Sequence, residues 1–278
     1  MEADGTIVLK QDDCSDVLKE MRNEVIDLTV TSPPYDNLRT YNQEDWKWGE
    51  AQWKPIIEEL YRVTKHGGVV VWIVGDATVN GSETGSSFKQ ALWAMECGFN
   101  LHDTMIWNKG RFTAVGTLNV RYASVFEYMF IFSKGSPKTF NPIKDRPCKT
   151  AGKAKSGTIR QRDGSTKRMS NEGWIQPEYG QRFNIWQVHP KGVKGHPAAF
   201  PEPLVRDHIV SWSNKGDTVL DPFMGSGTTG AASLLLNRNF IGIELDPEYF
   251  SIAQARINHA QNSMSTSLDD FLTDTFNH

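Results

Sequence analysis

Short runs of apolar residues recur along the 278-residue chain, and most have the length and composition of buried strands. The clearest covers 69–74, where Val, Trp and Ile follow one another without a polar residue. A strand needs no polar positions when helices cover both of its faces, as they do in a parallel sheet. The same reasoning predicts strands at 24–30, 101–107, 127–132, 218–221 and 240–244.

Helical spacing of apolar residues separates these strands. In 53–65 the apolar residues fall on one helical face, and Gly67 and Gly68 predict the end of that helix. A strand–helix alternation of this kind predicts an α/β fold with a doubly wound, mostly parallel sheet. Further helices are predicted at 15–21, 86–97, 201–212, 227–236 and 247–259, and the polar residues 263–278 as a frayed tail or a small extra helix.

The alternation stops between 135 and 199, where Gly, Pro, Ser, Thr, Lys and Arg dominate. This stretch is too long for an ordinary connection and is predicted to be an insertion or partly disordered. The net charge of the whole chain is -3, yet 134–196 holds fourteen Lys/Arg and four Asp/Glu, a local +10. That segregation indicates a surface for a polyanion or a solvated, lysine-rich loop. Trp174, Tyr179 and Phe183 are expected to anchor a small core within it.

Composition otherwise indicates an ordinary soluble globular protein. No apolar run approaches the roughly 18 residues that a membrane span needs, and the acidic N-terminus does not resemble a signal peptide. Three widely spaced cysteines predict no disulfide framework, and no histidine or cysteine spacing predicts a metal site. We therefore expect a cytoplasmic protein, bacterial or phage-encoded.

A glycine-rich turn follows the strand at 218–221. Gly225, Gly227 and Gly230 match G-x-G-x-x-G, and Glu244 ends the next strand, where a carboxylate can hold a ribose. The Lys of a phosphate loop is missing, and the acid Asp221 at the strand end would repel pyrophosphate. A ligand that carries ammonium and sulfonium charge suits this loop better. The sequence thus favours S-adenosylmethionine as the cofactor.

Two motifs give the chain a family resemblance. Ser32-Pro33-Pro34-Tyr35 and the run from Asp221 to Thr228, D-P-F-M-G-S-G-T, resemble the signatures of the DNA amino-methyltransferases, which modify cytosine N4 or adenine N6. The first motif precedes the second with the basic segment between them, which resembles the permuted β class. The resemblance implies a circularly permuted Rossmann-like methyltransferase fold, in which the basic insertion is the target-recognition segment.

The resemblance also implies a division of the chain. Residues 1–134 would form the catalytic half and 200–262 the cofactor-binding half of one methyltransferase domain. Residues 135–199 would be the inserted target-recognition segment, and 263–278 a polar tail.

Site residues follow from the same resemblance. Asp13 would contact the adenine edge of the cofactor, although a helix-cap role is the alternative. Glu244 would hold the ribose, and Asp221 would hold the methionine ammonium or a nearby water. Phe223 would line the cofactor pocket. The other predicted cofactor-binding residues are Pro222, Gly225, Ser226, Gly227 and Thr228. The predicted DNA-binding residues are Arg39, Lys149, Lys153, Lys155, Arg160, Arg162, Lys167 and Arg168, with a solvated surface role as the alternative for Arg39.

The chemistry explains the first motif independently. An exocyclic amino nitrogen is a poor nucleophile, because its lone pair is delocalised into the ring. Acceptors aimed at its N–H groups stabilise the charge that develops during methyl transfer, and Ser32 Oγ and the Pro33 carbonyl are such acceptors. The two prolines hold that carbonyl rigidly. Tyr35 would supply a face for an extruded base, because the target atom cannot be reached inside the duplex.

These readings predict a site-specific DNA methyltransferase that uses S-adenosylmethionine and transfers the methyl group directly. Ser32 in this context resembles cytosine-N4 enzymes more than adenine-N6 enzymes, and adenine N6 stays open. A methyltransferase for RNA or a protein glutamine, and a catalytically dead DNA-binding module, are more distant alternatives. Expected partners are double-stranded DNA, a second copy of the chain and a cognate restriction endonuclease.

Overall fold

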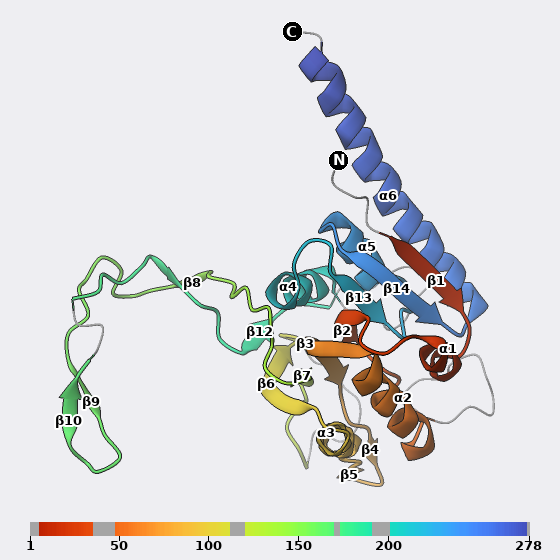
Figure 1. The fold of residues 1–278 in the computed structure, drawn as a ribbon. Coiled ribbons are helices and arrows are strands. Elements are labelled where there is room, and N and C mark those ends of the chain that lie inside the picture. The colour runs from red at the N-terminus through yellow and green to blue at the C-terminus, as the bar shows by residue number, and fades with distance from the viewer. Residues whose placement is uncertain (1–5, 36–47, 112–119, 170–172, 191–200, 277–278) are drawn as a thin grey trace. The chain divides into compact units, whose positions relative to one another are not determined.

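The computed structural model describes residues 6–35, 48–111, 120–169, 173–190 and 201–276, with side chains in the last helix only as far as 263 (Figure 1). The chain divides into two compact units. One comprises Met1–Asn141 together with Ile185–His278, and the other is Pro142–Asn184. The second unit is narrower than the predicted insertion, 135–199.

The larger unit is built on one eight-stranded sheet. Every neighbouring pair in it is parallel except those of β7, which runs antiparallel to both β3 and β6. The predicted α/β fold with a mostly parallel sheet is therefore confirmed. In spatial order the strands are β1 (Ile7–Gln11), β14 (Asn239–Glu244), β13 (Thr218–Asp221), β2 (Ile26–Thr31), β3 (Thr64–Val74), β7 (Phe126–Ser133), β6 (Asn100–Asn108) and β12 (Ile185–Gln187).

Helices cover both faces of this sheet. One layer holds α1 (Cys14–Glu20), α2 (Glu50–Val63) and α3 (Ser86–Glu96), and the other holds α4 (Glu202–Trp212), α5 (Thr228–Leu235) and α6 (Pro247–Phe276) (Figure 1). The last helix continues to Phe276, through the stretch that was predicted as a frayed tail or a small extra helix. A small hairpin of β4 (Thr78–Val79) and β5 (Ser82–Glu83) precedes α3. Within the described residues, no helix is long and apolar enough to cross a membrane.

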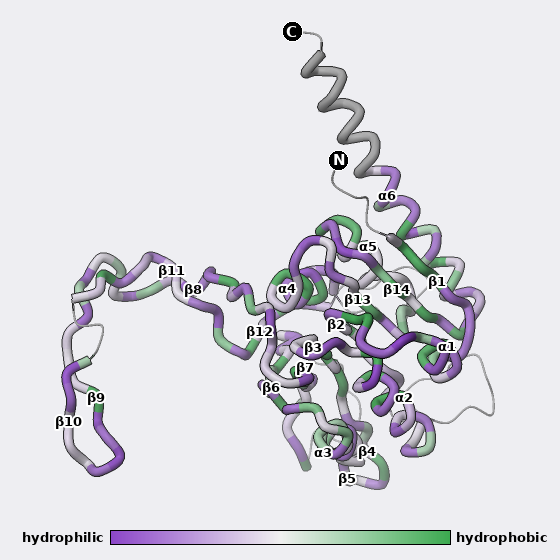
Figure 2. The backbone as a smooth tube through the Cα atoms, viewed as in Figure 1, coloured by the Kyte–Doolittle hydropathy of each residue, from purple (hydrophilic) through white to green (hydrophobic). Residues whose placement is uncertain are grey.

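Strand β3 shows why its sequence lacks polar positions. Val70, Trp72 and Val74 pack into the apolar cluster that α1, α2 and α3 complete. Val71 and Ile73, which point the other way along the pleat, are equally buried on the opposite face. Figure 2 shows that hydrophobic segments coincide with the strands of this sheet. The core therefore lies on both sides of β3 and β2 and holds the ends of these strands in place.

The junction between α2 and β3 differs from the prediction. The helix ends at Val63, and β3 begins at Thr64, whose hydroxyl donates to Leu60 O at 2.6 Å. Gly67 and Gly68 therefore lie inside the strand and are not the helix stop. Gly67 has φ +84, and the pairing of β2 with β3 shifts register at this point. The glycine pair serves a bulge, which is its other common role in a strand.

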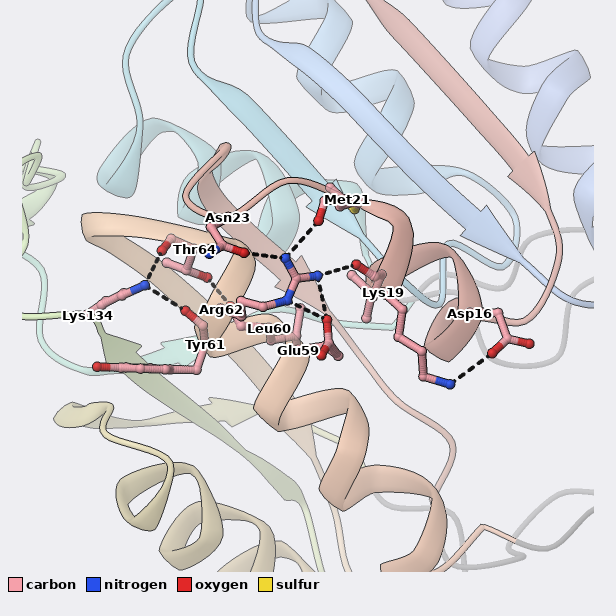
Figure 3. A network of polar contacts seen from close by, with 11 residues as sticks. Asp16, Lys19, Met21, Asn23, Glu59, Leu60, Tyr61, Arg62, Thr64 and Lys134 are labelled. Carbon is pink, nitrogen blue, oxygen red and sulfur yellow. Dashed lines mark hydrogen bonds and ion pairs between the residues drawn. The ribbon is translucent and has the colours of Figure 1, made fainter.

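Cationic side chains donate hydrogen bonds to carbonyls at the ends of α1 and α2 (Figure 3). Arg62 donates to Leu18 O at 2.6 Å and Met21 O at 2.7 Å, and it forms an ion pair with Glu59. Lys134 donates to Tyr61 O and to Thr64 O, each at 3.0 Å. Because helix C-termini leave such carbonyls without intrahelical partners, these contacts fix the turns that lead into β2 and β3.

Among its described residues the smaller unit contains two short antiparallel pairs, β8 (Arg146–Pro147) with β11 (Tyr179–Gly180) and β9 (Thr158–Arg160) with β10 (Thr166–Arg168). The expectation of an aromatic core in this segment is wrong. Trp174 and Phe183 are 50% and 66% exposed, and they carry cations on their faces, Lys155 Nζ at 5.0 Å and Arg146 Cζ at 4.4 Å respectively. The two rings are therefore exposed and each contacts a basic side chain, which keeps its charge near water.

Candidate functional site

The motif residues meet at one edge of the larger unit's sheet. Asp13 follows β1, while Glu244 and Asp221 end β14 and β13, and Ser32 follows β2. These four strands are adjacent and parallel, so their carboxyl ends lie side by side. Ligands of open α/β sheets bind at such an edge. The structure thus brings the two sequence motifs together across 190 residues of chain, through a hydrogen bond between Thr31 and Asp221.

Asp221 organises the glycine loop from within. Its Oδ1 accepts from the Thr31 hydroxyl at 2.6 Å and from the Phe223 amide at 3.1 Å, and its Oδ2 accepts from the Thr229 hydroxyl at 2.6 Å. The residue is 1% exposed. Burial raises the pKa of the Asp221 carboxyl to about 6, although the three hydrogen bonds oppose the rise. A contact with the methionine ammonium stays a prediction, since protein donors engage both oxygens here.

The three glycines of the motif serve two needs. Gly225, at φ +49, turns its amide toward Glu244 Oε2 at 2.8 Å. Gly227 has φ +75, and a Cβ there would lie 2.9 Å from Ala253 Cα in α6. A Cβ on Gly230 would lie 2.5 Å from Ile257 Cδ1 in the same helix. Two of the three glycines therefore allow α6 to pack closely against α5. The sequence pattern alone cannot distinguish this packing role from a role in close approach of a ligand.

Glu244 and Asp13 lie at the ends of paired strands. Gln11 pairs with Glu244, and the Asp12 amide donates to Glu244 O at 3.1 Å. Besides the Gly225 amide, the Glu244 carboxylate accepts from the Asp246 amide at 3.0 Å, and burial raises its pKa. Asp13 Oδ1 accepts from the Ser15 amide at 2.7 Å and caps α1. The helix-cap role of Asp13 is confirmed, and its contact with adenine stays a prediction.

The remaining loop residues are mostly enclosed. Phe223 lies edge-on to Trp48 and Trp72, with centroid distances of 5.4 and 6.3 Å. Thr228 Oγ1 accepts from Arg256 of α6 at 2.8 Å. Pro222, Ser226 and Gly227 are buried. This packing fixes the loop backbone before any ligand arrives.

The Ser-Pro-Pro-Tyr segment leaves the sheet directly after β2. Pro33 is buried and Ser32 is partly exposed, so the serine lies on the accessible side of the strand end. Two residues without an N–H end the β-ladder here, as the sequence predicts. Tyr35 packs against the core cluster through its ring. The stacking role of Tyr35 stays a prediction.

The tyrosine hydroxyl reaches residues that sequence reasoning missed. Tyr35 Oη lies 2.9 Å from Ser32 Oγ and 2.7 Å from Glu127 Oε2. Glu127, at the start of β7, is 8% exposed and forms an ion pair with Lys109, which follows β6. The sequence feature that could have indicated Glu127 is an acidic residue at the start of an otherwise apolar strand, E-Y-M-F-I-F. Its partner could not be found by spacing, because the antiparallel pairing of β6 and β7 brings the two residues together.

The predicted DNA-binding residues belong to other parts of the chain. Arg39 lies outside the described residues. The other seven are in the Pro142–Asn184 unit, which has ten basic and four acidic side chains, a net +6. Six of the seven are exposed, and Lys155 is partly covered: Lys149, Lys153, Lys155, Arg160, Arg162, Lys167 and Arg168.

Comparison with known proteins found a matching family and several similar proteins. A family model described as DNA methylase, of the N6/N4 type, matches residues 26–255. The orphan methyltransferase M.BamHII of Bacillus amyloliquefaciens is 52% identical over 244 residues, which cover 84% of this chain and 89% of that protein. The type II methyltransferase M.MjaI of Methanocaldococcus jannaschii is 30% identical over 291 residues, covering 88% of this chain and 89% of that one.

Solved structures share the fold at lower sequence identity. The cytosine-N4-specific PvuII DNA methyltransferase superposes with a TM-score of 0.63 at 20% identity, over 90% of this chain and 86% of that chain. The complex of M1.HpyAVI with S-adenosylmethionine gives a TM-score of 0.61 at 23% identity, over 90% of this chain and all of that chain. The Rossmann-like fold predicted from the motifs is confirmed.

Proposed function

This chain belongs to the N6/N4 DNA methylase family, and on that premise we propose that it transfers a methyl group from S-adenosylmethionine to the exocyclic amino group of an extruded DNA base. The observation that supports this most directly is the hydrogen bond that ties the strand bearing Ser32 to the carboxylate of the glycine loop. It sets an acceptor for the amino group beside the place where a cofactor would bind.

The residues at the sheet edge fit S-adenosylmethionine. Asp13, Asp221 and Glu244 present three carboxyl groups along adjacent strand ends, which suit a cationic nucleoside and would repel a phosphate. Glu244 is held by two backbone amides, so its carboxylate is fixed in orientation at a strand end. When bound, the cofactor supplies an electrophilic methyl group. Phe223, Gly225 and the buried loop residues around them would form the wall of its pocket.

The Ser-Pro-Pro-Tyr segment would carry the chemistry. Ser32 Oγ and the Pro33 carbonyl accept from the two amino N–H groups and stabilise the charge that develops on nitrogen. Pro33 and Pro34 hold those acceptors without mobile amides nearby. Transfer is direct, with no covalent bond between enzyme and base.

Cytosine N4 is the preferred target. The support is Ser32 in its T-S-P-P-Y context, which resembles cytosine-N4 enzymes more than adenine-N6 enzymes. A hydroxyl and a carboxylate can both accept from an amino group, so adenine N6 is the alternative. The structural neighbour described as cytosine-N4-specific shares only 20% identity and supports the fold alone.

Target recognition falls to the Pro142–Asn184 unit in this proposal. Its β9–β10 ribbon is the kind of two-stranded element that a DNA major groove admits. Paired residues of a ribbon share a face, so Arg160 with Thr166 and Arg168 with Thr158 lie on one side, and Ile159 with Lys167 on the other. Figure 2 shows a strongly hydrophilic turn between the two strands. We assign the arginine–threonine side to the DNA.

A labelled-methyl transfer assay tests the function. Purified chain is incubated with labelled S-adenosylmethionine and, in parallel, with duplex DNA, RNA and a protein mixture. Label should enter duplex DNA, and nucleoside analysis should give N4-methylcytosine. N6-methyladenine would overturn the choice of base, whereas label in RNA or protein alone, or no transfer at all, would overturn the proposal.

The predicted partners other than DNA stay predictions. One similar protein is named an orphan methyltransferase and others type II methyltransferases, so the names do not agree on a restriction partner. A homodimer would be tested by light scattering of the full chain.

A further inference from the structure

A buried acid lies behind the Ser-Pro-Pro-Tyr segment without a role in the function proposed above. Glu127 Oε2 is 2.7 Å from Tyr35 Oη, which in turn is 2.9 Å from Ser32 Oγ. The other carboxylate oxygen, Oε1, pairs with Lys109. Serine, tyrosine, glutamate and lysine thus form one continuous polar chain that begins at the accessible end of β2.

Three strands hold this chain of groups together. β7 lies between β3 and β6, with Tyr128 opposite Val74 and Glu127 opposite Trp107. Gly75 follows β3 at the same level, and a Cβ there would lie 3.4 Å from Glu127 Cγ and 3.8 Å from Tyr35 Cε2. A Cβ at Gly75 would therefore be in ordinary van der Waals contact with both groups, so Glu127 and Tyr35 lie beside the end of β3.

The charges fix the direction of every proton in the chain. A carboxylate that is paired with a lysine ammonium accepts hydrogen bonds and donates none. Tyr35 has a single hydroxyl proton, and we assign it to Glu127 Oε2, because this charged acceptor lies at 2.7 Å, nearer than Ser32 Oγ at 2.9 Å and Ile73 O at 3.4 Å. The tyrosine oxygen then accepts from Ser32. Because the proton of Ser32 is engaged inward, its lone pairs are left to accept from a base amino group.

We propose that Glu127 is a positioning residue for methyl transfer and the final acceptor of the released proton. This inference rests on the proposed function. As the amino nitrogen bonds to the methyl carbon, the methyl–sulfur bond breaks and its electron pair stays on sulfur. The nitrogen loses one proton to Ser32 Oγ, Ser32 passes its own proton to Tyr35, and Tyr35 passes its own to the Glu127 carboxylate. Glu127 then releases the proton to water, and each group regains its starting state.

Two conservative substitutions test the chain of groups. Tyr35→Phe keeps a ring on which a base can stack but removes the hydroxyl, and Glu127→Gln keeps an acceptor oxygen but cannot hold the charge or take up the proton. Each should lower kcat by about a hundredfold to ten-thousandfold, the contribution typical of a positioned proton-transfer group. The KM for S-adenosylmethionine should stay within about twofold, because neither side chain lies in the predicted cofactor pocket. Tyr61→Phe, a tyrosine packed against the same core cluster, is the matched control and should keep the wild-type kcat.

The double variant separates a catalytic from a purely structural role. Denaturation midpoints of the four proteins should be non-additive, which reports the Tyr35–Glu127 hydrogen bond without any activity measurement. The kcat of the double variant should equal that of the slower single variant, because both changes interrupt one path. Non-additive midpoints with a wild-type kcat in Tyr35→Phe would overturn the inference alone. An inactive wild type would overturn the proposed function and the inference together.

Discussion

The edge of the sheet that carries the proposed active site and the basic Pro142–Asn184 unit use polar residues in opposite ways. At the edge, Asp221 and Glu127 are 1% and 8% exposed, and each is held by named donors. In the basic unit, Arg160 and Lys167 are exposed and lie on a two-stranded ribbon. Acceptors for a developing charge must be fixed before the reaction, whereas attraction of phosphates needs only charge near the surface. The two regions should therefore respond differently to the same kind of substitution.

The largest difference is expected for the Ser-Pro-Pro-Tyr segment. Exchange of both Pro33 and Tyr35 for alanine frees the acceptor carbonyl and removes the ring and hydroxyl. Methyl transfer should fall by at least about a hundredfold, the loss typical of one misplaced group in such a site. Affinity for duplex DNA should change by less than about threefold, because the basic unit is untouched. Transfer at the wild-type rate would contradict the site assignment.

Two glycines with the same backbone angle allow a comparison of packing. Gly227 in the loop and Gly152 in the basic unit both have φ +75, but a Cβ on Gly227 meets the backbone of α6 at 2.9 Å and one on Gly152 meets nothing within 4 Å. Gly152→Ala should lower the free energy of unfolding by about 1 kcal/mol, the strain of a left-handed residue. Gly227→Ala adds overpacking and should cost about 3 kcal/mol.

Urea unfolding of both glycine variants checks this expectation. The cofactor is omitted, so that the effect on stability is separated from that on binding. An equal decrease in the free energy of unfolding in the two variants would show that α6 shifts to make room for the added Cβ. The close approach of α5 and α6 would then not constrain the residue at Gly227.

A buried carboxyl at the edge should also give the chain a specific pH dependence. The folded pKa of Asp221 is about 6, above its ordinary 3.8, so between these values the folded chain binds more protons than the unfolded chain. The free energy of unfolding should therefore rise as the pH falls through 6 toward 4. Relative to Asp221→Asn, the wild type should gain about 1 kcal/mol between pH 7 and pH 5. Urea unfolding of both proteins at both pH values measures this gain. An equal change in the free energy of unfolding in the two proteins would contradict the prediction.

The sequence predicted the edge well because its motifs are long and lie where strands end. The runs S-P-P-Y and D-P-F-M-G-S-G-T each combine a chain break with chemistry, and the structure brings their strands, β2 and β13, side by side. Strand β3 was equally clear, since helices on both faces demand an unbroken apolar run. These features depend on residues that are close in the sequence.

What the sequence did not reveal depends on distant pairing. Glu127 and Lys109 meet because β6 and β7 pair antiparallel, and no local spacing encodes that contact. β12 has only three residues, and the residues of β1 are partly buried or exposed with none fully buried. Neither strand is therefore recognisable from its sequence. The aromatic residues of the basic unit were wrongly predicted to form a core. Two of them contact basic side chains instead, and burying those charges together with the rings would be unfavourable.

The smallest expected effect distinguishes the two sides of the β9–β10 ribbon. Arg160 shares a face with Arg168, and Lys167 lies on the other face beside Ile159. Arg160→Ala should weaken binding to duplex DNA by about threefold to tenfold and lower the slope of log affinity against log salt by about 1 if it neutralises a phosphate. Lys167→Ala removes one charge of equal sign from the same ribbon and should change affinity less than about twofold. Fluorescence anisotropy with a labelled duplex, titrated at several salt concentrations, measures both quantities. Equal effects of the two substitutions would mean that the ribbon attracts DNA by net charge alone, and the assignment of one face to the groove would then be wrong.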